Sequence, residues 1–393
     1  MTPLALLFVA LFNSILGLSL LFPIMGPLGR ELGLGELQVG ALTAGYALAQ
    51  FVGSPYWGRK SETSGRKPVL LLGIVGFGVT FLAFAGVAHL GLTGALSGPG
   101  LFAALLSTRL VGGLLSSATL PTVQAYIADV TSRDERTSGM ALIGAAFGLA
   151  VVFGPAIGAL LAPMGLLIPV YVSSAVAGLN ALFVWITLPE PKRHVKAEQP
   201  PGTWLVAGKV RVLLAVGFVT TLASVSMEQT IAFYFQDRLA LTPKGAARAV
   251  GLSLVLYGLV SVLVQGVIVR RIHAKPLQLL RFGVPIAAMG LVLLAAAEWR
   301  SMLVVAMALQ GIGQALAMPG VTAALSLSVR DDEQGAVAGL NSSCQALART
   351  AGPLLGTGLY EIDPGYPYLF GAALLFVVLL FLWTSRSPSL RTS

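Results

Sequence analysis

The feature that most constrains this chain is a succession of apolar runs, separated by short stretches of Gly, Pro and basic residues. A helix crosses the bilayer core with about 20 apolar residues, so each run of that length predicts one membrane-spanning helix. We predict twelve spans, at residues 4–27, 37–58, 68–89, 101–128, 137–162, 166–187, 210–235, 247–270, 276–297, 301–328, 335–360 and 366–385.

The composition argues against a soluble protein. Only 10% of the 393 residues are charged and 56% are hydrophobic, whereas a soluble domain carries about 25% charged residues. The net charge is +9, but a nucleic-acid-binding protein would gather its basic residues on one soluble face. Here they occupy the gaps between apolar runs, so we expect membrane lipid and no nucleic acid among the partners.

Lys and Arg are concentrated in alternate gaps, as in the pairs Arg59–Lys60, Arg66–Lys67 and Lys192–Arg193. Loops rich in Lys and Arg stay on the cytoplasmic side of a membrane. We therefore predict a multi-pass protein of the bacterial inner (plasma) membrane, with both termini and the central loop in the cytoplasm.

The chain divides into two similar halves. The polar segment 189–209 is predicted to be a cytoplasmic linker between bundles at 1–188 and 210–393. Parallel repeats of this kind are typical of transporters, with the substrate site between the repeats at the membrane midplane. Corresponding positions in the two halves are Tyr46 and Tyr257, Gly113 and Gly311, and the runs Gly154-Pro155-x-x-Gly158 and Gly352-Pro353-x-x-Gly356.

The loop after the second predicted span reads Gly58-Arg59-Lys60-Ser61-Glu62-Thr63-Ser64-Gly65-Arg66-Lys67. It resembles the G-x-x-x-D-R-x-G-R-K signature of the major facilitator superfamily, with Glu62 for Asp and Thr63 for the first Arg. The alternative is an ordinary basic loop. The resemblance implies an all-α membrane protein with the major facilitator fold, twelve helices in two pseudo-symmetric six-helix bundles. It also implies a gating motif made of Gly58, Glu62, Gly65, Arg66 and Lys67, in which the acid caps a helix or pairs with the bases and latches the halves.

The fifth predicted span contains Gly144, Gly148, Gly154, Pro155 and Gly158. This pattern resembles the antiporter motif of exporters in the superfamily, although small residues also serve general helix packing. Together with Glu228 and the run from Asp332 to Gly356, it is similar to the drug:proton antiporter branch that contains the NorA-type quinolone efflux pumps. That resemblance implies a monomeric, proton-coupled exporter of amphipathic drug-like small molecules that works by alternating access.

Two charges within the spans are candidates for proton coupling. Glu228 lies in the seventh span, and an acid withdrawn from water holds its proton more tightly, as a proton carrier must. Arg109 matches the fourth-helix arginine of drug:proton antiporters, which is thought to assist proton transfer. Each has a structural alternative, a permanently partnered carboxyl group and a guanidinium bonded to backbone carbonyls. The antiporters' second acid, in helix ten, aligns with Ala315.

Aromatic and amide side chains on the first, fourth, seventh and tenth spans suit a cavity for an amphipathic substrate. Each residue taken alone could equally be a packing residue. The candidate cavity residues are Asn13, Gln124, Gln229, Phe233, Tyr234, Gln310 and Gln314.

The sequence contains no catalytic constellation and no Walker A motif, so we expect neither an enzyme nor ATP as the energy source. Its one cysteine, Cys344, and its three histidines have no metal-ligand spacing, and no metal or cofactor is expected. Two alternatives stay open. One is an exporter or importer of a specific metabolite, siderophore, sugar or lipid, and the other is a transport-inactive membrane sensor or assembly protein.

Overall fold

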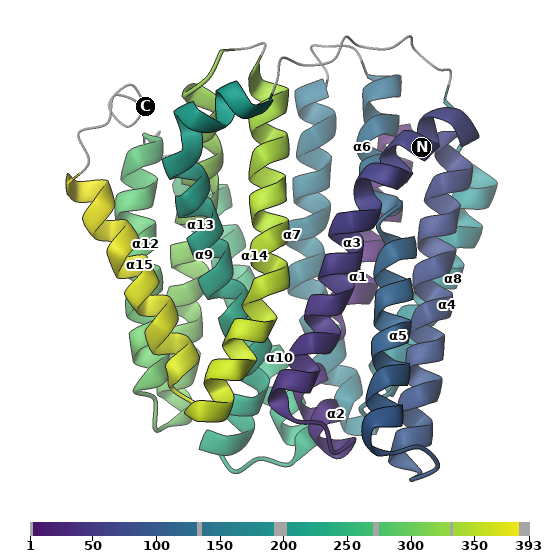
Figure 1. Ribbon diagram of the computed structural model, residues 1–393, viewed down its shortest axis with the longest axis vertical. Coiled ribbons are helices and arrows are strands. Elements are labelled where there is room, and N and C mark those ends of the chain that lie inside the picture. The colour runs from purple at the N-terminus through teal and green to yellow at the C-terminus, as the bar shows by residue number, and fades with distance from the viewer. Residues whose placement is uncertain (1–2, 132–135, 192–202, 270–274, 331–332, 385–393) are drawn as a thin grey trace. The chain divides into compact units, whose positions relative to one another are not determined.

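The computed structural model describes residues 3–131, 136–191, 203–269, 275–330 and 333–384, and throughout these ranges the regular structure is helical. Figure 1 shows long helices joined by short connections. The prediction of an all-α protein is therefore confirmed.

The chain forms two compact units, one made of Met1–Lys196 with Ala240–Val255 and the other of Ala197–Leu239 with Leu256–Ser393. The proposed boundaries at 188 and 210 stay a prediction, because 192–202 of the linker lies outside the described residues.

The first unit contains the helices up to residue 187. They are α1 (Pro3–Ser19), α2 (Met25–Glu31), α3 (Glu36–Ser64), α4 (Arg66–Leu92), α5 (Gly98–Ser116), α6 (Thr119–Val130), α7 (Arg136–Leu161), the short η1 (Ala162–Met164) and α8 (Ile168–Thr187). One residue, Gly65, separates α3 from α4, and its φ of +97° is a conformation that glycine adopts without strain.

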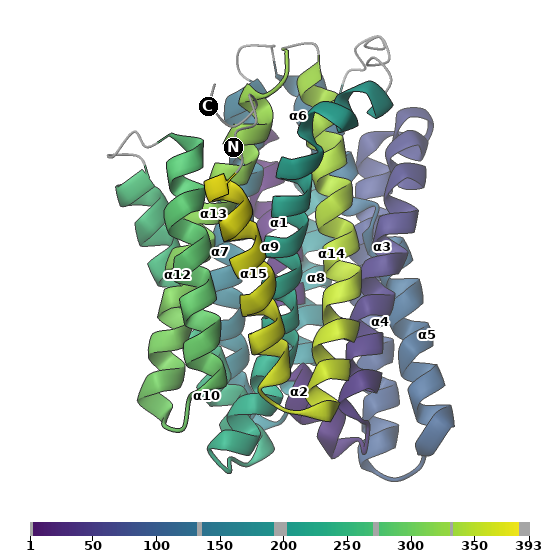
Figure 2. The same ribbon diagram turned by 60° about the vertical axis from the view of Figure 1, so that its left-hand side comes forward.

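The remaining helices follow the linker. They are α9 (Thr203–Arg238), α10 (Pro243–Leu263), the π-helical η2 (Val264–Val269), α12 (Pro276–Ala295), α13 (Arg300–Leu327), α14 (Gln334–Ile362) and α15 (Tyr366–Thr384). In the second unit, α9 packs mainly against α14, and α12 against α13 and α15. Figure 2 shows α14 running beside α9.

Within the described ranges, nine helical segments are long and apolar enough to cross a membrane. Three predicted spans are absent from this set. The first corresponds to α1, an apolar helix of 17 residues, and to α2. The other two correspond to α3 and α14, which have 29 residues each but more polar sequences. A helix thus occupies every predicted span, while the count of twelve crossings stays a prediction.

The repeat predicted from the sequence is visible in the close contacts between helices. A Cβ added to Gly113 of α5 would lie 2.3 Å from the Tyr46 carbonyl oxygen, and one added to Gly311 of α13 would lie 2.6 Å from that of Tyr257. Both distances require glycine, because real Cβ atoms do not approach so closely. The same tyrosine–glycine contact therefore occurs in both halves of the sequence.

The two GPxxG runs behave in the same way. A Cβ on Gly154 would lie 2.3 Å from the Ser19 Cβ at the end of α1, and one on Gly352 would lie 2.9 Å from the Val225 side chain of α9. These glycines let α7 approach α1, and α14 approach α9, more closely than larger residues would permit.

Candidate functional site

Glu228 lies on α9, and several Ser and Thr hydroxyl groups lie near it on this otherwise apolar helix. Thr220 and Thr230 bond to backbone carbonyls one turn earlier, at 2.7 and 2.9 Å, which satisfies them inside an apolar span. The Ser224 hydroxyl instead donates to Glu228 Oε1 at 3.0 Å. The Glu228 side chain is partly buried, so its carboxyl group is held by a neutral hydroxyl within the span.

Two further groups act on this carboxyl group. The positive charge of Arg349 on α14 interacts with Glu228. The Tyr257 phenol of α10 also interacts electrostatically with Glu228 and lies close to Ser224. The Arg349 side chain is exposed. Ser224 was missed, and the repeat alignment was the one signal that marked Tyr257.

Arg109 of α5 is surrounded by aromatic rings of the first unit. Its side chain is 4% exposed, and its guanidinium carbon lies 4.6 Å from the ring centre of Tyr46 and 5.5 Å from those of Phe81 and Phe84. Its Nε and one Nη are buried without a hydrogen-bond partner in the described part of the chain. The rings stabilise the cation through cation–π contact.

The cage around Arg109 is fixed by a hydrogen-bonded tyrosine. The Tyr46 hydroxyl lies 2.8 Å from Ser116 Oγ, and Gln50 Nε2 donates to Ser116 at 3.2 Å. These bonds hold the Tyr46 ring between α3 and α5 and keep its face toward the guanidinium.

The gating motif contains an ion pair that does not involve Glu62. Arg66 Nε lies 2.8 Å from Asp129 Oδ2 at the end of α6, and Arg66 Nη1 donates to Ser61 Oγ at 2.7 Å. Both charged side chains are largely buried. Glu62 itself is exposed. The predicted latch between the halves through Glu62 stays a prediction.

The acid that caps α4 is Glu190, which follows the end of α8. Its two oxygens accept the backbone N–H groups of Arg66, at 2.5 Å, and Lys67, at 2.9 Å. The first N–H groups of a helix have no partner within the helix, and a carboxylate there is favoured by the helix dipole. Lys67 Nζ in turn donates to the Trp185 carbonyl at 2.7 Å near the end of α8. Sequence reasoning expected an acid to cap this turn but placed it inside the loop.

The antiporter-motif residues of α7 fall into two groups. Gly154, Pro155 and Gly158 are buried, and a Cβ on Gly158 would lie 2.6 Å from the Leu20 carbonyl oxygen. A Cβ on Gly144 or Gly148 would meet no atom within 4 Å. The second part of the motif thus serves close packing on the end of α1, whereas the first part leaves open space beside the helix.

The predicted cavity residues also separate into two groups. Phe233 and Tyr234 are fully buried, and the Tyr234 hydroxyl donates to the Ala295 carbonyl at 3.1 Å. Gln310 and Gln314 are buried and donate to the carbonyls of Ala287 and Thr220, at 2.7 and 3.4 Å. The less buried members are Asn13 and Gln229, which are partly buried, and Gln124, which is exposed.

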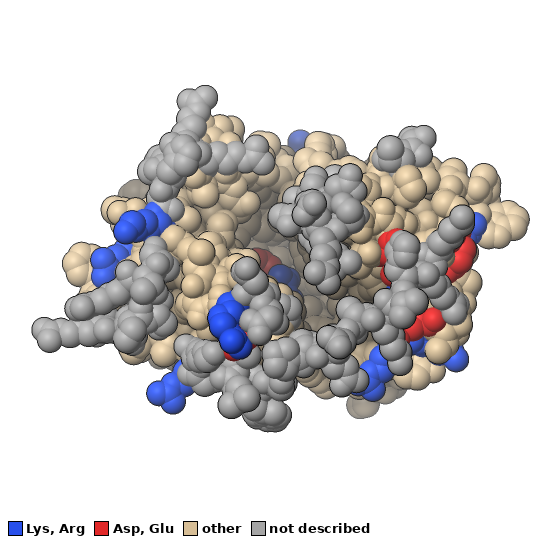
Figure 3. All heavy atoms as spheres, turned by 90° about the horizontal axis from the view of Figure 1, so that it is seen from above, with Lys and Arg blue, Asp and Glu red and all other residues tan. Residues whose placement is uncertain are grey.

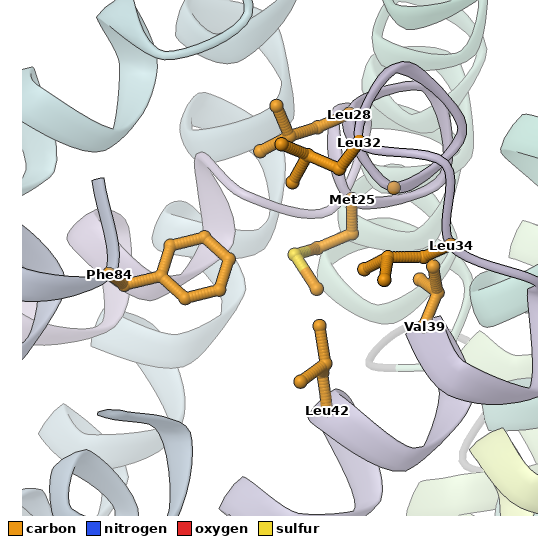
Figure 4. A pocket seen from close by; sticks show the side chains of 8 residues that line it. Met25, Leu28, Leu32, Leu34, Val39, Leu42 and Phe84 are labelled. Atoms are coloured by element: carbon orange, nitrogen blue, oxygen red, sulfur yellow. The ribbon is translucent and has the colours of Figure 1, made fainter. Parts of the chain in front are cut away.

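A small apolar gap lies between α2, α3 and α4 in the first unit (Figure 4). It encloses no volume that would admit a water molecule, whereas ligand pockets usually have about 300 to 1,000 Å³. Because its lining is apolar, it offers no orienting contact to a polar group. The lining residues are Met25, Leu28, Gly29, Leu32, Leu34, Val39, Leu42 and Phe84.

Comparison with known proteins decides the family. The sequence profile of the Major Facilitator Superfamily matches residues 7–297 and 277–393. The chain belongs to the Major Facilitator Superfamily. The resemblance drawn from the gating loop is therefore confirmed, and membership of this family makes the protein a transporter and not an enzyme.

Relatives within the superfamily cover nearly the whole chain. Multidrug resistance protein 2 of Bacillus subtilis is 26% identical over 93% of this chain and 91% of its own length. Quinolone resistance protein NorA of Staphylococcus aureus is 23% identical over 98% of this chain and 97% of its own. A crystallised D-xylose–proton symporter has the same fold, with a TM-score of 0.78 over 99% of both chains at 15% identity. The protein is thus a multi-pass transporter with relatives that are named for drug resistance.

Proposed function

We propose that this transporter is a proton-coupled exporter of amphipathic, drug-like small molecules. Glu228 takes up a proton from the outside and releases it to the cytoplasm. The substrate enters from the cytoplasm or the inner leaflet, and the two loads exclude one another as the protein alternates between its inward- and outward-open states.

The observation that carries this proposal is the setting of Glu228. A carboxyl group within an apolar span is costly when charged and marks a functional site by default. It accepts a hydrogen bond from the neutral Ser224 hydroxyl, which tolerates both the ionised and the neutral acid. Arg109, by contrast, keeps its proton because a guanidinium does not lose it in proteins. We therefore assign proton carriage to Glu228, whereas Arg109 provides a fixed positive charge in the first unit.

We assign the substrate contacts to the candidate side chains that helix packing leaves accessible. Asn13, Gln124 and Gln229 are the members of the cavity set that helix packing does not bury, and we propose that they orient the substrate. The buried members, Phe233 and Tyr234 among them, support the wall behind it. The names of the relatives point to drug-like cargo, and a monomer suffices for this scheme.

We further propose that the end of the first unit at which α3 passes into α4 and α8 ends faces the cytoplasm of a bacterial inner membrane. This end of the first unit is uppermost in Figure 1. Figure 3 looks from that side and shows Lys and Arg side chains there. Basic residues of this kind favour the cytoplasmic side.

The test uses the purified protein in liposomes, a fluoroquinolone as the probe, and a pH gradient of either sign. Antiport predicts that the probe accumulates when the lumen is acidic, whereas symport predicts accumulation when the bath is acidic. Collapse of the gradient with an ionophore must abolish the accumulation, and protein-free liposomes give the passive background.

The decisive variant is Glu228→Gln, with Glu298→Gln at an exposed acid after α12 as the matched control. The Glu228 variant should lose all gradient-driven accumulation yet keep exchange of labelled for unlabelled probe, because exchange needs no proton. Undiminished uphill transport by Glu228→Gln would refute the proposal.

A further inference from the structure

Arg349 and Glu228 lie on two helices that approach each other closely. On α14, Arg349, Gly352 and Gly356 share one face, since residues three and seven apart align on a helix. Cβ atoms added to these glycines would lie 2.9 Å from the Val225 side chain and 2.8 Å from the Ser226 carbonyl oxygen of α9. The Ser226 hydroxyl also donates to the Gly352 carbonyl at 3.0 Å.

The carboxyl group of Glu228 points back along α9 to the level of that contact. Side chains of a helix lean toward its N-terminus, and Glu228 accordingly bonds to Ser224, one turn earlier. Ser224 directly precedes Val225, which contacts Gly352, and Arg349 lies one turn before Gly352. The backbone of Arg349 thus lies within about one helical turn of that carboxyl group along the α9–α14 pair, and the positive charge of Arg349 acts on Glu228.

The remaining helices around α9 contribute neutral groups. The α10 side chain near this point is the Tyr257 phenol, which lies close to Ser224. On α13, Gln314 donates its hydrogen bond to the Thr220 carbonyl. On α15, the Tyr368 hydroxyl accepts a hydrogen bond from the Thr230 hydroxyl at 3.2 Å. Arg349 is therefore the cation that acts on Glu228 among the groups that the described residues place there.

The Arg349 side chain is exposed rather than enclosed by helices. A guanidinium at mid-span that faced lipid would be strongly unfavourable, so an exposed one faces water or a polar cavity. Water at Arg349 gives the neighbouring acid a route along which a proton can arrive and leave.

We propose that Arg349 is the internal counter-cation of Glu228 and the positioning residue that sets the pH at which this acid releases its proton. Ser224 and Tyr257 complete the site by holding the carboxyl group toward Arg349. This inference rests on the proposed role of Glu228 as the proton carrier. It assigns the charge that balances the carboxylate after the proton has left, without which an ionised acid in an apolar span would be prohibitively costly.

The test measures the proton on Glu228 directly and needs no substrate. The infrared carbonyl band of the neutral acid is followed against pH in the purified protein, and the contribution of Glu228 is identified by its loss in Glu228→Gln. Arg349→Gln should move the midpoint of this band to higher pH by about one unit, because removal of a nearby positive charge favours the neutral acid. Arg349→Lys should restore a midpoint close to that of the native protein.

The controls separate an electrostatic role from a merely structural one. Arg300→Gln removes an exposed arginine at the start of α13 and should leave the midpoint in place. Arg349→Met supplies a second neutral variant of similar length if the glutamine variant does not fold. A midpoint that stays constant in the folded neutral variants, or moves to lower pH, would overturn the inference.

The outcomes also distinguish this inference from the proposed function. A shifted midpoint in a protein that exports nothing under either gradient would support Arg349 as the counter-cation and reject proton-coupled export. Gradient-driven export with an unchanged midpoint would support proton-coupled export and reject Arg349 as the counter-cation.

Discussion

The surroundings of Tyr46 in the first unit and of Tyr257 in the second share one backbone frame, a tyrosine in close contact with a glycine of a neighbouring helix. The two frames contain opposite charges. In both, the tyrosine backbone lies against a glycine of a neighbouring helix, Gly113 or Gly311. Around Tyr46 that frame holds Arg109 in an aromatic cage. Around Tyr257 it holds an acid, Glu228, bonded to a hydroxyl and accompanied by an exposed arginine.

The difference shows how a duplicated scaffold divides its tasks. The Arg109 guanidinium is sealed among rings and keeps its charge under all conditions, so it suits a fixed structural cation. Glu228 lies among polar groups and beside an exposed cation, so its charge can change. The shared backbone contact fixes the helices, and the side chains around it decide whether the charge is permanent or exchangeable.

The largest expected effect tests the shared frame. Gly113→Ala and Gly311→Ala should each lower the free energy of unfolding by about 1–3 kcal/mol, because the added methyl group would overlap a tyrosine carbonyl and force the helices apart. Thermal unfolding of the purified protein measures the loss. Gly144→Ala and Gly339→Ala, where a Cβ meets nothing within 4 Å, are the matched controls. A loss in one half only would break the comparison.

The next effect tests the permanence of the Arg109 charge. Arg109→Lys should lower stability by about 2 kcal/mol, because an ammonium cannot stack on the Tyr46, Phe81 and Phe84 rings as a guanidinium does. The midpoint of the pH profile of transport should remain that of the native protein. A shifted midpoint at unchanged stability would place Arg109 on the proton path and contradict the division of tasks.

The smallest effect compares the two tyrosines by one substitution. Tyr46→Phe should lower the free energy of unfolding by about 1 kcal/mol, because Ser116 and Gln50 lose a buried hydrogen-bond partner. Tyr257→Phe should instead raise the pH midpoint of transport by about half a unit, since a polar hydroxyl group close to the Glu228 carboxylate is removed. Equal effects of both variants on stability, with no change in either pH profile, would remove the distinction.

Local pattern was sufficient to predict the helices and the family. Hydropathy marked a helix at each predicted span, because a bilayer imposes its apolar thickness on the chain residue by residue. The spacing of Gly58, Gly65, Arg66 and Lys67 identified the superfamily. Gly113 and Gly311 occupy corresponding positions in the two halves and so revealed the repeat, because helices that approach closely require glycine at the point of contact.

The partners of the polar side chains depended on the tertiary structure. An acid was expected to cap the turn before α4, but Glu190, more than a hundred residues away, does so in place of Glu62. Phe233 and Gln310 have the residue types of a cavity wall, yet both are buried in helix packing. Hydropathy cannot separate these cases, because a side chain that faces a neighbouring helix and one that faces a cavity lie on equally apolar spans.

The sequence by itself determined that this protein is a duplicated bundle of membrane helices with an acid, Glu228, inside one of them. Only the tertiary structure decided which charge accompanies that acid and which charge is sealed away. The physical reason is range: the cost of entering a bilayer is set locally along each helix, whereas hydrogen bonds and charge pairing depend on which faces of distant helices meet.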